Sequence, residues 1–188
     1  MPDLTSFWIS FRVALISTMI VTIFGILISK WLYNKNRYWV NLLESFIILP
    51  IVLPPTVLGF ILLIIFSTRS PVGEFFTNIL HLPVVFTLTG AVIASVIVSF
   101  PLMYQHTVNG FRSIDSKMLN TARTMGASET KIFLKLVLPL SKRSILAGIM
   151  MSFARAIGEF GATLMVAGYI PDKTNTCLLY TSDAADER

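Results

Sequence analysis

Charged side chains are scarce in this chain. Asp, Glu, Lys and Arg make up 13% of its 188 residues, whereas hydrophobic residues make up 54%. A soluble domain carries about 25% charged residues, so the shortfall excludes an ordinary soluble protein. Apolar runs near 13–29, 42–66, 84–103 and 145–170 approach or exceed the roughly 20 residues that cross a bilayer. The composition predicts an all-α polytopic membrane protein with at least four transmembrane helices.

The signatures of common enzyme classes are also missing from the sequence. There is no G-x-x-x-x-G-K-[ST] phosphate loop, so we expect no ATP hydrolysis by this chain. No H-E-x-x-H or G-x-S-x-G motif occurs. His81 and His106 fall at opposite membrane ends and cannot form a metal cluster together. We therefore predict no catalytic residues, no metal and no cofactor, with an intramembrane enzyme as the weaker alternative.

Cysteine is almost absent, and the single residue lies in a tail of unusual character. The last twelve residues, "CLLYTSDAADER", contain Cys177 and three of the ten acids. Back-translated, they resemble a transposon-end adapter used in sequencing libraries. We expect 1–176 to be a transmembrane domain that is truncated at its C-terminus, and 177–188 to be a sequencing or cloning scar, which is excluded from fold reasoning. A short polar native tail is the alternative.

The net charge of +5 is concentrated in two loops between the spans. By the positive-inside rule these loops are cytoplasmic, which places the N-terminus outside. The loop between the second and third spans has one Arg and one Glu, as an external loop should. This distribution argues against nucleic acid as a partner. The basic residues are Lys30, Lys35 and Arg37 in the first loop, and Arg112, Lys117, Arg123, Lys131, Lys135, Lys142 and Arg143 in the second.

The loop over 115–139 has the pattern of two short amphipathic helices. Asp115 can cap the first helix and Gly126 can form its C-terminal corner, because glycine adopts positive φ at little cost. Ser128 can cap the second helix, and Pro139 is expected to stop it. The apolar positions are Met118, Leu119, Ala122 and Met125 in the first helix, and Ile132, Phe133, Leu136, Val137 and Leu140 in the second. Such a loop suits either the lipid headgroups or a partner protein.

Two charges interrupt the fourth apolar run, in "FARAIGEFGAT". Arg155 and Glu159 are one helical turn apart and can pair. Ala154, Gly158 and Ala162 form a stripe of small residues beside them, suited to close helix contact. Because a charge inside the membrane costs at least ~2.5–3.5 kcal/mol, this face should turn toward protein or a wet cavity. The pair either fixes helix packing or lines a pore or gate.

The second run contains Pro50, Pro54 and Pro55 in "LPIVLPPTVLGF". Backbone groups freed by proline must find partners inside a bilayer, so a broken helix belongs beside protein or a cavity. We expect this span to be kinked.

The loop resembles the signature loop of ABC-importer permeases, in which E-A-A, three residues, Gly, nine residues and I-x-L-P follow one another. The E-A-A positions are occupied here by Asn120, Thr121 and Ala122, and the last four by Leu136, Val137, Leu138 and Pro139. "ARTMGAS", "FARAIGEFGAT", "IPDKT", "LPIVLPPTVLGF" and "SFPLMYQ" resemble the oxyanion branch of this family, which includes the molybdate and sulfate permeases.

The resemblance implies a pore-forming subunit of an ATP-driven oxyanion importer in a prokaryotic cytoplasmic membrane. Molybdate or tungstate is preferred, and sulfate or thiosulfate is the alternative. The implied partners are membrane lipid, ABC ATPase subunits that bind ATP-Mg, a second permease copy and an external oxyanion-binding protein. A non-transporting scaffold is the alternative from another class. The implied coupling residues are Asn120, Thr121, Ala122, Gly126, Ala127, Leu136, Leu138 and Pro139, and the pore or gate residues are Arg155, Gly158, Glu159, Gly161, Pro54 and Pro55.

Overall fold

The computed structural model describes residues 4–33, 37–79, 84–159 and 161–168, and within these ranges the regular structure is helical. Two helices are long and apolar enough to cross a membrane, and the number rises to four if each of two bent pairs is one span. The elements are α1 (Leu4–Tyr33), α2 (Arg37–Val52), α3 (Pro55–Phe66), α4 (Pro71–Glu74), η1 (Phe75–Ile79), α5 (Leu88–Arg112), α6 (Ser116–Thr124), α7 (Glu129–Ile132), η2 (Phe133–Val137), α8 (Leu138–Leu140), α9 (Lys142–Ile157) and α10 (Gly161–Ala167).

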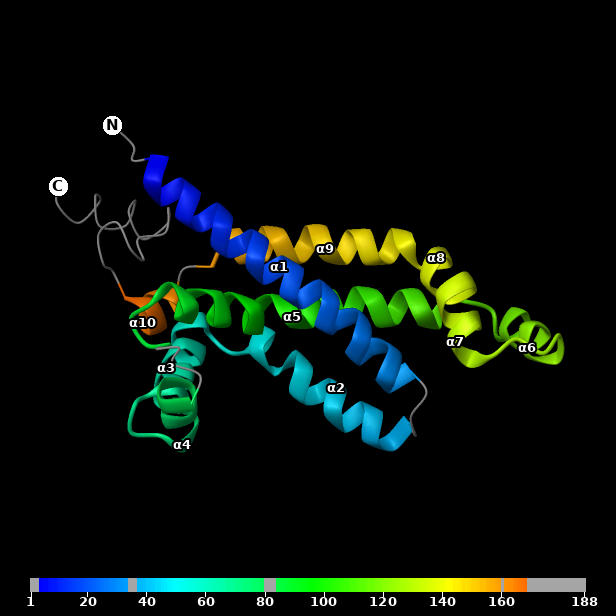
Figure 1. Ribbon diagram of the computed structural model, residues 1–188, viewed down its shortest axis with the longest axis horizontal. Coiled ribbons are helices and arrows are strands. Elements are labelled where there is room, and N and C mark those ends of the chain that lie inside the picture. The colour runs from blue at the N-terminus through cyan, green and yellow to red at the C-terminus, as the bar shows by residue number, and fades with distance from the viewer. Residues whose placement is uncertain (1–3, 34–36, 80–83, 160, 169–188) are drawn as a thin grey trace.

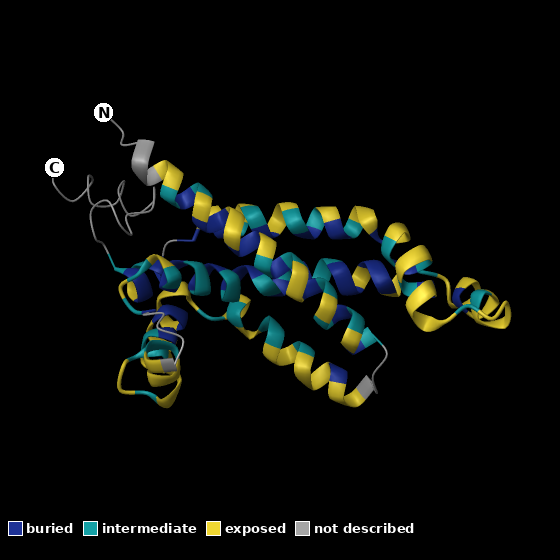
Figure 2. Cartoon of the chain, in the orientation of Figure 1, coloured by how far each residue is buried: buried dark blue, intermediate teal, exposed yellow. Residues whose placement is uncertain are grey.

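Helix α5 is the centre of the molecule, with α1 and α9 packed along it (Figure 1). Buried residues are concentrated on α5, while α1 and α9 keep exposed outer faces (Figure 2). Glycines allow the close packing: a Cβ on Gly25 of α1 would lie 2.7 Å from the Met103 side chain of α5. A Cβ on Gly148 of α9 would lie 3.0 Å from the same side chain. Small residues at these crossings are typical of membrane helices.

The second apolar run is broken more sharply than a kink. Helices α2 and α3 meet at an angle of 113°. Pro54 has φ −55° and ψ 137°, the extended geometry that a residue before proline is forced to adopt. Pro55 then begins α3, where its missing N–H costs no hydrogen bond. The kink predicted from the prolines is confirmed, although 42–66 is not one continuous helix.

The fourth run is also divided. Helix α9 ends at Ile157, and α10 begins at Gly161. Gly158 caps α9 by donating its N–H to the Ala154 carbonyl. The short α10 packs against α3 and the start of α5 (Figure 1). The fourth apolar run is therefore not one continuous helix, although α9 and α10 together can form one bent span.

The third run begins later and extends further than its hydropathy indicates. Helix α5 continues nine residues beyond the predicted 84–103 segment, to Arg112. This extra length is stabilised by packing, since Tyr104, Val108 and Phe111 are buried. The chain that follows the predicted 84–103 segment therefore starts with about two and a half turns of helix before the loop begins.

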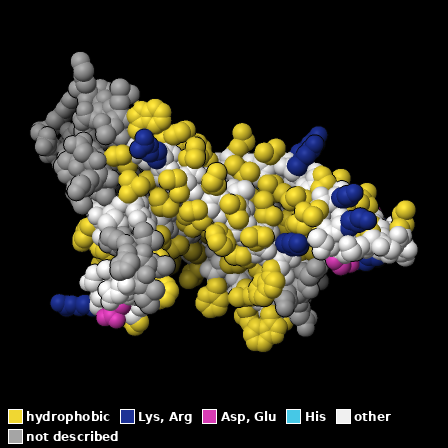
Figure 3. Space-filling view, in the orientation of Figure 1, with side chains coloured by type: hydrophobic (Ala, Val, Ile, Leu, Met, Phe, Trp, Pro, Cys, Tyr) yellow, Lys and Arg dark blue, Asp and Glu magenta, His cyan; other side chains and the backbone are white. Residues whose placement is uncertain are grey.

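Hydrophobic side chains cover the middle of the molecule, and basic side chains gather toward the end that carries α6 to α8 (Figure 3). Helix α6 lies furthest from the spans at this end (Figure 1). Helices α3 and α10 lie at the opposite end. The described part of the chain thus has two places where the predicted functional residues gather.

Candidate functional site: a two-helix loop and a broken membrane helix

Helix α6 begins directly after Asp115, the cap residue predicted from the sequence. Asp115 accepts a hydrogen bond from the Lys117 N–H at 2.9 Å and so satisfies a donor at the free end of the helix. Leu119 is buried and Ala122 packs beside it. Met118 and Met125 are exposed, at 47% and 82%, and do not join the core as the apolar spacing predicts. The helix therefore buries a narrow face and leaves two flexible apolar side chains available to a partner.

Gly126 forms the predicted corner. Its φ is +79°, in the left-handed region that favours glycine. The Ala127 N–H donates to the Ala122 carbonyl at 3.1 Å, and the Gly126 N–H donates to the Arg123 carbonyl at 2.9 Å. These two bonds make a complete Schellman motif. The direction in which the chain leaves α6 is thus fixed by local hydrogen bonds.

An ion pair closes the corner across its two helices. Arg123 Nε donates to Glu129 Oε1 at 2.7 Å, and Arg123 Nη2 donates to Glu129 Oε2 at 3.3 Å. Arg123 Nη1 also donates to Asn120 Oδ1 at 2.9 Å. The hydrogen bond from Arg123 lowers the pKa of Glu129 below its ordinary value. Asn120 therefore supports Arg123 from the position where the family motif has Glu.

The second helix of the loop runs from Glu129 to Leu140 and widens in the middle. Ser128 occupies the cap position, but its side chain makes no cap hydrogen bond. The helix ends at Leu140, one residue after Pro139, close to where this proline was predicted to stop it, and the π-helical turn η2 precedes the proline. A π turn accommodates proline because it moves the preceding carbonyls away from the ring. Leu136 is partly buried and Leu140 is 54% exposed.

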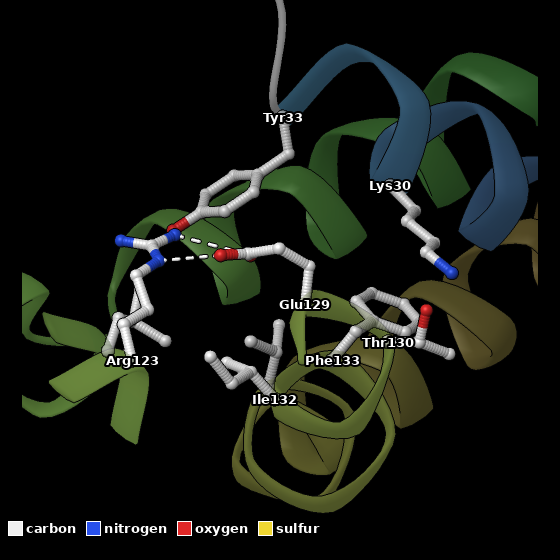
Figure 4. Close-up of a pocket in the computed structure, with 9 residues that line it drawn as sticks. Lys30, Tyr33, Arg123, Glu129, Thr130, Ile132 and Phe133 are labelled. Atoms are coloured by element: carbon white, nitrogen blue, oxygen red, sulfur yellow. Dashed lines mark hydrogen bonds and ion pairs between the residues drawn. The ribbon is translucent and has the colours of Figure 1, made fainter. Parts of the chain in front are cut away.

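The loop packs against the end of α1 around a small pocket (Figure 4). The Tyr33 ring extends from α1 toward Arg123 and Glu129, and the Lys30 amine lies beside the Phe133 ring (Figure 4). The distance from Lys30 Nζ to the centre of this ring is 4.4 Å. The loop is thus joined to α1 as well as to its chain neighbours α5 and α9.

Arg155 and Glu159 form the predicted pair, but across a helix break. Arg155 Nη1 lies 2.6 Å from Glu159 Oε2, and their side chains are 33% and 1% exposed. Glu159 Oε1 also accepts a hydrogen bond from the Ala162 N–H of α10 at 2.9 Å. The buried carboxylate therefore joins the last turn of α9 to the first turn of α10, and the arginine extends outward from it.

The two breaks lie against each other. A Cβ on Gly161 would come within 2.8 Å of the Pro55 ring. A Cβ on Gly59 would come within 2.8 Å of the Ala162 Cα. Only glycine permits this approach of α10 to α3, so the structure brings Pro55, Gly161 and Glu159 to one end of the molecule. Pro54 and Gly158 are exposed at the breaks.

Sequence reasoning missed Glu44 on α2. Its Oε1 accepts hydrogen bonds from the Tyr104 hydroxyl at 2.9 Å and from Arg112 Nη2 at 2.6 Å. These contacts hold α2 against α5, although α2 exposes much of its apolar surface. The available signal was an isolated acid in an apolar segment, which usually marks a paired or functional position.

Comparison with known proteins shows which family has this combination of broken spans and a two-helix loop. Residues 9–180 match the family model described as the binding-protein-dependent transport system inner membrane component. The chain belongs to this family. Its apolar helices agree with an inner-membrane component of a transport system, and the family's members are permease subunits rather than enzymes.

Several curated permeases are similar to this chain over most of its length. YvgM of Bacillus subtilis, named as a molybdenum transport system permease protein, is 46% identical over 168 residues, which are 89% of this chain and 74% of that protein. ModB of Escherichia coli K12, a molybdenum transport system permease protein, is 34% identical over 175 residues, 93% of this chain and 76% of that protein. A Chlorokybus atmophyticus protein named as a sulfate transport system permease is 31% identical over 173 residues, 92% of this chain and 60% of that protein.

Proposed function

We propose that this permease is the pore-forming subunit of an ATP-driven importer for molybdate or tungstate. The observation that carries the proposal is the 46% identity to a protein named as a molybdenum permease. The lower identity, 31%, to a protein named as a sulfate permease makes sulfate the second candidate. Family membership implies an ATPase partner and a binding-protein partner, and we infer that ATP-Mg binds to the ATPase.

The loop supports docking of the ATPase. Helix α6 extends away from the spans (Figure 1), and Met118 and Met125 leave apolar surface on it. The Gly126 corner and the Arg123–Glu129 pair give the loop one defined shape. A rigid, protruding element is suited to receive movement from a partner and pass it on to the spans.

The broken helices support a gate. Arg155 is anchored by a buried carboxylate and still has a third of its side chain exposed. An anchored guanidinium can attract an oxyanion without holding it tightly, because Glu159 offsets part of its charge. A few helices cannot enclose a pore alone, so we infer a dimer. Exposed Leu146, Met150 and Ile157 on α9 supply apolar surface for the second copy.

Transport is tested with the native permease in proteoliposomes, together with its ATPase and binding protein. We expect ATP-dependent uptake of molybdate that excess tungstate suppresses and excess sulfate leaves largely intact. Preferential sulfate uptake would select the second candidate. ATP-independent behaviour, with no ATPase recruited, would favour the scaffold alternative.

The proposal for the tail concerns sequence rather than transport. Residues 177–188 lie outside the described residues. A long genomic read through codon 176 tests whether they are a scar. We expect the native frame to depart from "CLLYTSDAADER", and an unchanged frame would mean that the tail is native.

A further inference from the structure

One contact of the loop is made far from it in sequence. Lys30 lies in the last turn of α1, and its Nζ is 4.4 Å from the centre of the Phe133 ring. Phe133 begins η2, the π-helical turn of the loop. This cation–π contact joins the first span to the second loop helix. The chain itself connects the loop only to α5 and α9, so this contact links the loop to a third helix, α1.

The same ring is held from a second side. The Phe133 and Phe111 rings are 5.5 Å apart in an edge-to-face arrangement, and the Phe111 and Tyr33 rings are 6.2 Å apart in another. Phe111, on α5, is fully buried. Edge-to-face contacts depend on orientation as well as distance. Phe133 is therefore fixed between α1 and α5 by rings whose relative positions matter.

The other end of the loop is coupled to this ring by the ion pair. Arg123 of α6 holds Glu129, which lies one turn before Phe133 on the same helix. In Figure 4 the Arg123–Glu129 pair and the Lys30–Phe133 contact border the same pocket. A displacement of α6 is therefore passed to Phe133 without first passing through α9.

We propose that movement of the loop displaces the end of α1 as well as α9. Lys30, Tyr33 and Phe133 are the positioning residues that connect the loop to α1. The proposal rests on the proposed function, because the displacement comes from an ATPase bound to α6. Movement of the loop pulls on α1 through the ring at the same time as it pulls on α9 through the chain. The two spans then move together, since both also pack along α5.

The test compares anion taken up per ATP hydrolysed in proteoliposomes that contain permease, ATPase and binding protein. Lys30→Gln removes the cation, and Phe133→Leu removes the ring but keeps apolar volume. We expect each change to lower the ratio by roughly threefold to tenfold, the size of one cation–π contact. The double variant should be no worse than Phe133→Leu alone, because that change already removes the contact that Lys30→Gln removes. Lys30→Arg and Phe133→Tyr keep a cation and a ring and should restore the ratio.

Two control variants remove the same kinds of group, a cation and an aromatic ring, at positions outside the Lys30–Phe133 contact. Lys131→Gln removes an exposed cation from the same loop helix, and Phe24→Leu removes a ring from α1 that is 54% exposed. Both should leave the ratio unchanged. A wild-type ratio in Lys30→Gln and Phe133→Leu overturns the proposal. So does a loss that merely follows the yield of assembled complex and is not restored by Lys30→Arg. A wild-type complex without ATP-driven uptake refutes the proposed function instead, and this inference with it.

Discussion

At the scale of single residues, Arg155 and Glu159 each occupy the helix end that favours their charge. Arg155 lies in the last turn of α9, where the helix dipole is negative, and Glu159 precedes α10, where the dipole is positive. In a continuous helix this order of charges would be the less favourable one. Because α9 ends at Ile157 and α10 is a separate helix, an unfavourable order of charges becomes a favourable one, and each charge gains about 0.3–2 kcal/mol from its helix end.

Replacing Glu159 separates its two contacts. Glu159→Gln keeps an oxygen that can accept the Ala162 N–H but loses the charge that pairs with Arg155. We expect uptake to fall about tenfold, the effect of roughly 1.4 kcal/mol, while the yield of complex stays near wild type. Glu159→Ala should lower the yield as well. If the yield of Glu159→Gln complex falls before its transport activity does, the pair serves packing alone.

The Arg123–Glu129 pair predicts a pH response with a defined sign. The pKa of Glu129 is lowered in the folded loop, so the pair is fully formed above the ordinary carboxyl pKa of about 4.3 and is lost as the pH falls through the lowered value. Between pH 8 and 5 the corner should therefore be unaffected. The carboxyl ¹³C shift of Glu129 should titrate below the ordinary range, and Arg123→Gln should move the midpoint back toward it. An identical midpoint in both proteins would mean that the pair does not form in solution.

At the scale of elements, the corner of the loop depends on backbone conformation alone. Nothing lies within 4 Å of a Cβ at Gly126, whose φ is +79°. A substitution there is strained by its backbone and not by a clash, and the left-handed region costs an ordinary residue about 1–2 kcal/mol. We expect Gly126→Val to uncouple ATP hydrolysis from uptake while the chain still inserts. Gly126→Asn should stay close to wild type because Asn tolerates this conformation. Normal coupled uptake by Gly126→Val would refute docking through this loop.

The contact between the two broken spans is the opposite case, because there the effect of a substitution depends on the room available for an added Cβ. Gly161→Ala places a methyl group 2.8 Å from the Pro55 ring, whereas the nearest atom to a Cβ at Gly158 is 3.4 Å away. Overpacking of this kind costs typically 1–3 kcal/mol. We therefore expect Gly161→Ala to lower the thermal unfolding midpoint of the complex and Gly158→Ala to leave it nearly unchanged. Equal midpoints would show that α3 and α10 separate easily.

The features that the sequence predicts best are local ones. Asp115 and Gly126 act within one or two turns of themselves, so their cap and corner follow from residue type. The length of α5 and the π turn before Pro139 were missed because contacts from other helices set them. Phe111 and Val137, for example, pack in one core cluster with residues of α1 and α9. The separation of Arg155 from Glu159 by a helix end was missed for a similar reason, since α10 is held by α3 from far earlier in the chain.

At the scale of the whole molecule, the charge asymmetry predicts an orientation. The end with α6 to α8 should face the cytoplasm, and the loop around Thr68 should face outside. Both Thr68 and Lys117 are exposed. In a Cys177→Ser background, a membrane-impermeant maleimide applied to intact spheroplasts should label Thr68→Cys and not Lys117→Cys. The reverse labelling pattern would overturn the N-terminus-outside topology.

Family membership and the number of apolar runs could be predicted from the sequence at this scale, because hydropathy and motif order are properties of the chain itself. The contact of α3 with α10 and the Glu44 network could not. Each joins residues that are far apart in sequence, and the contact depends on how separate helices pack against one another. Glu44 of α2 contacts Tyr104 and Arg112 only because α2 packs against α5 at the level of these two residues.

The sharp turn between α2 and α3 also bears on how the protein is made. Helix α3 has 12 residues and is about 18 Å long, too short to cross a hydrocarbon core of about 30 Å. Its buried residues Leu58 and Leu62 share a cluster with Ala162 and Val166 of α10, which the ribosome adds about one hundred residues later. During synthesis α3 therefore gains this packing partner only after the 115–139 loop and α9 have been made. The final shape of the second span is set late in biogenesis, by the last helix described here.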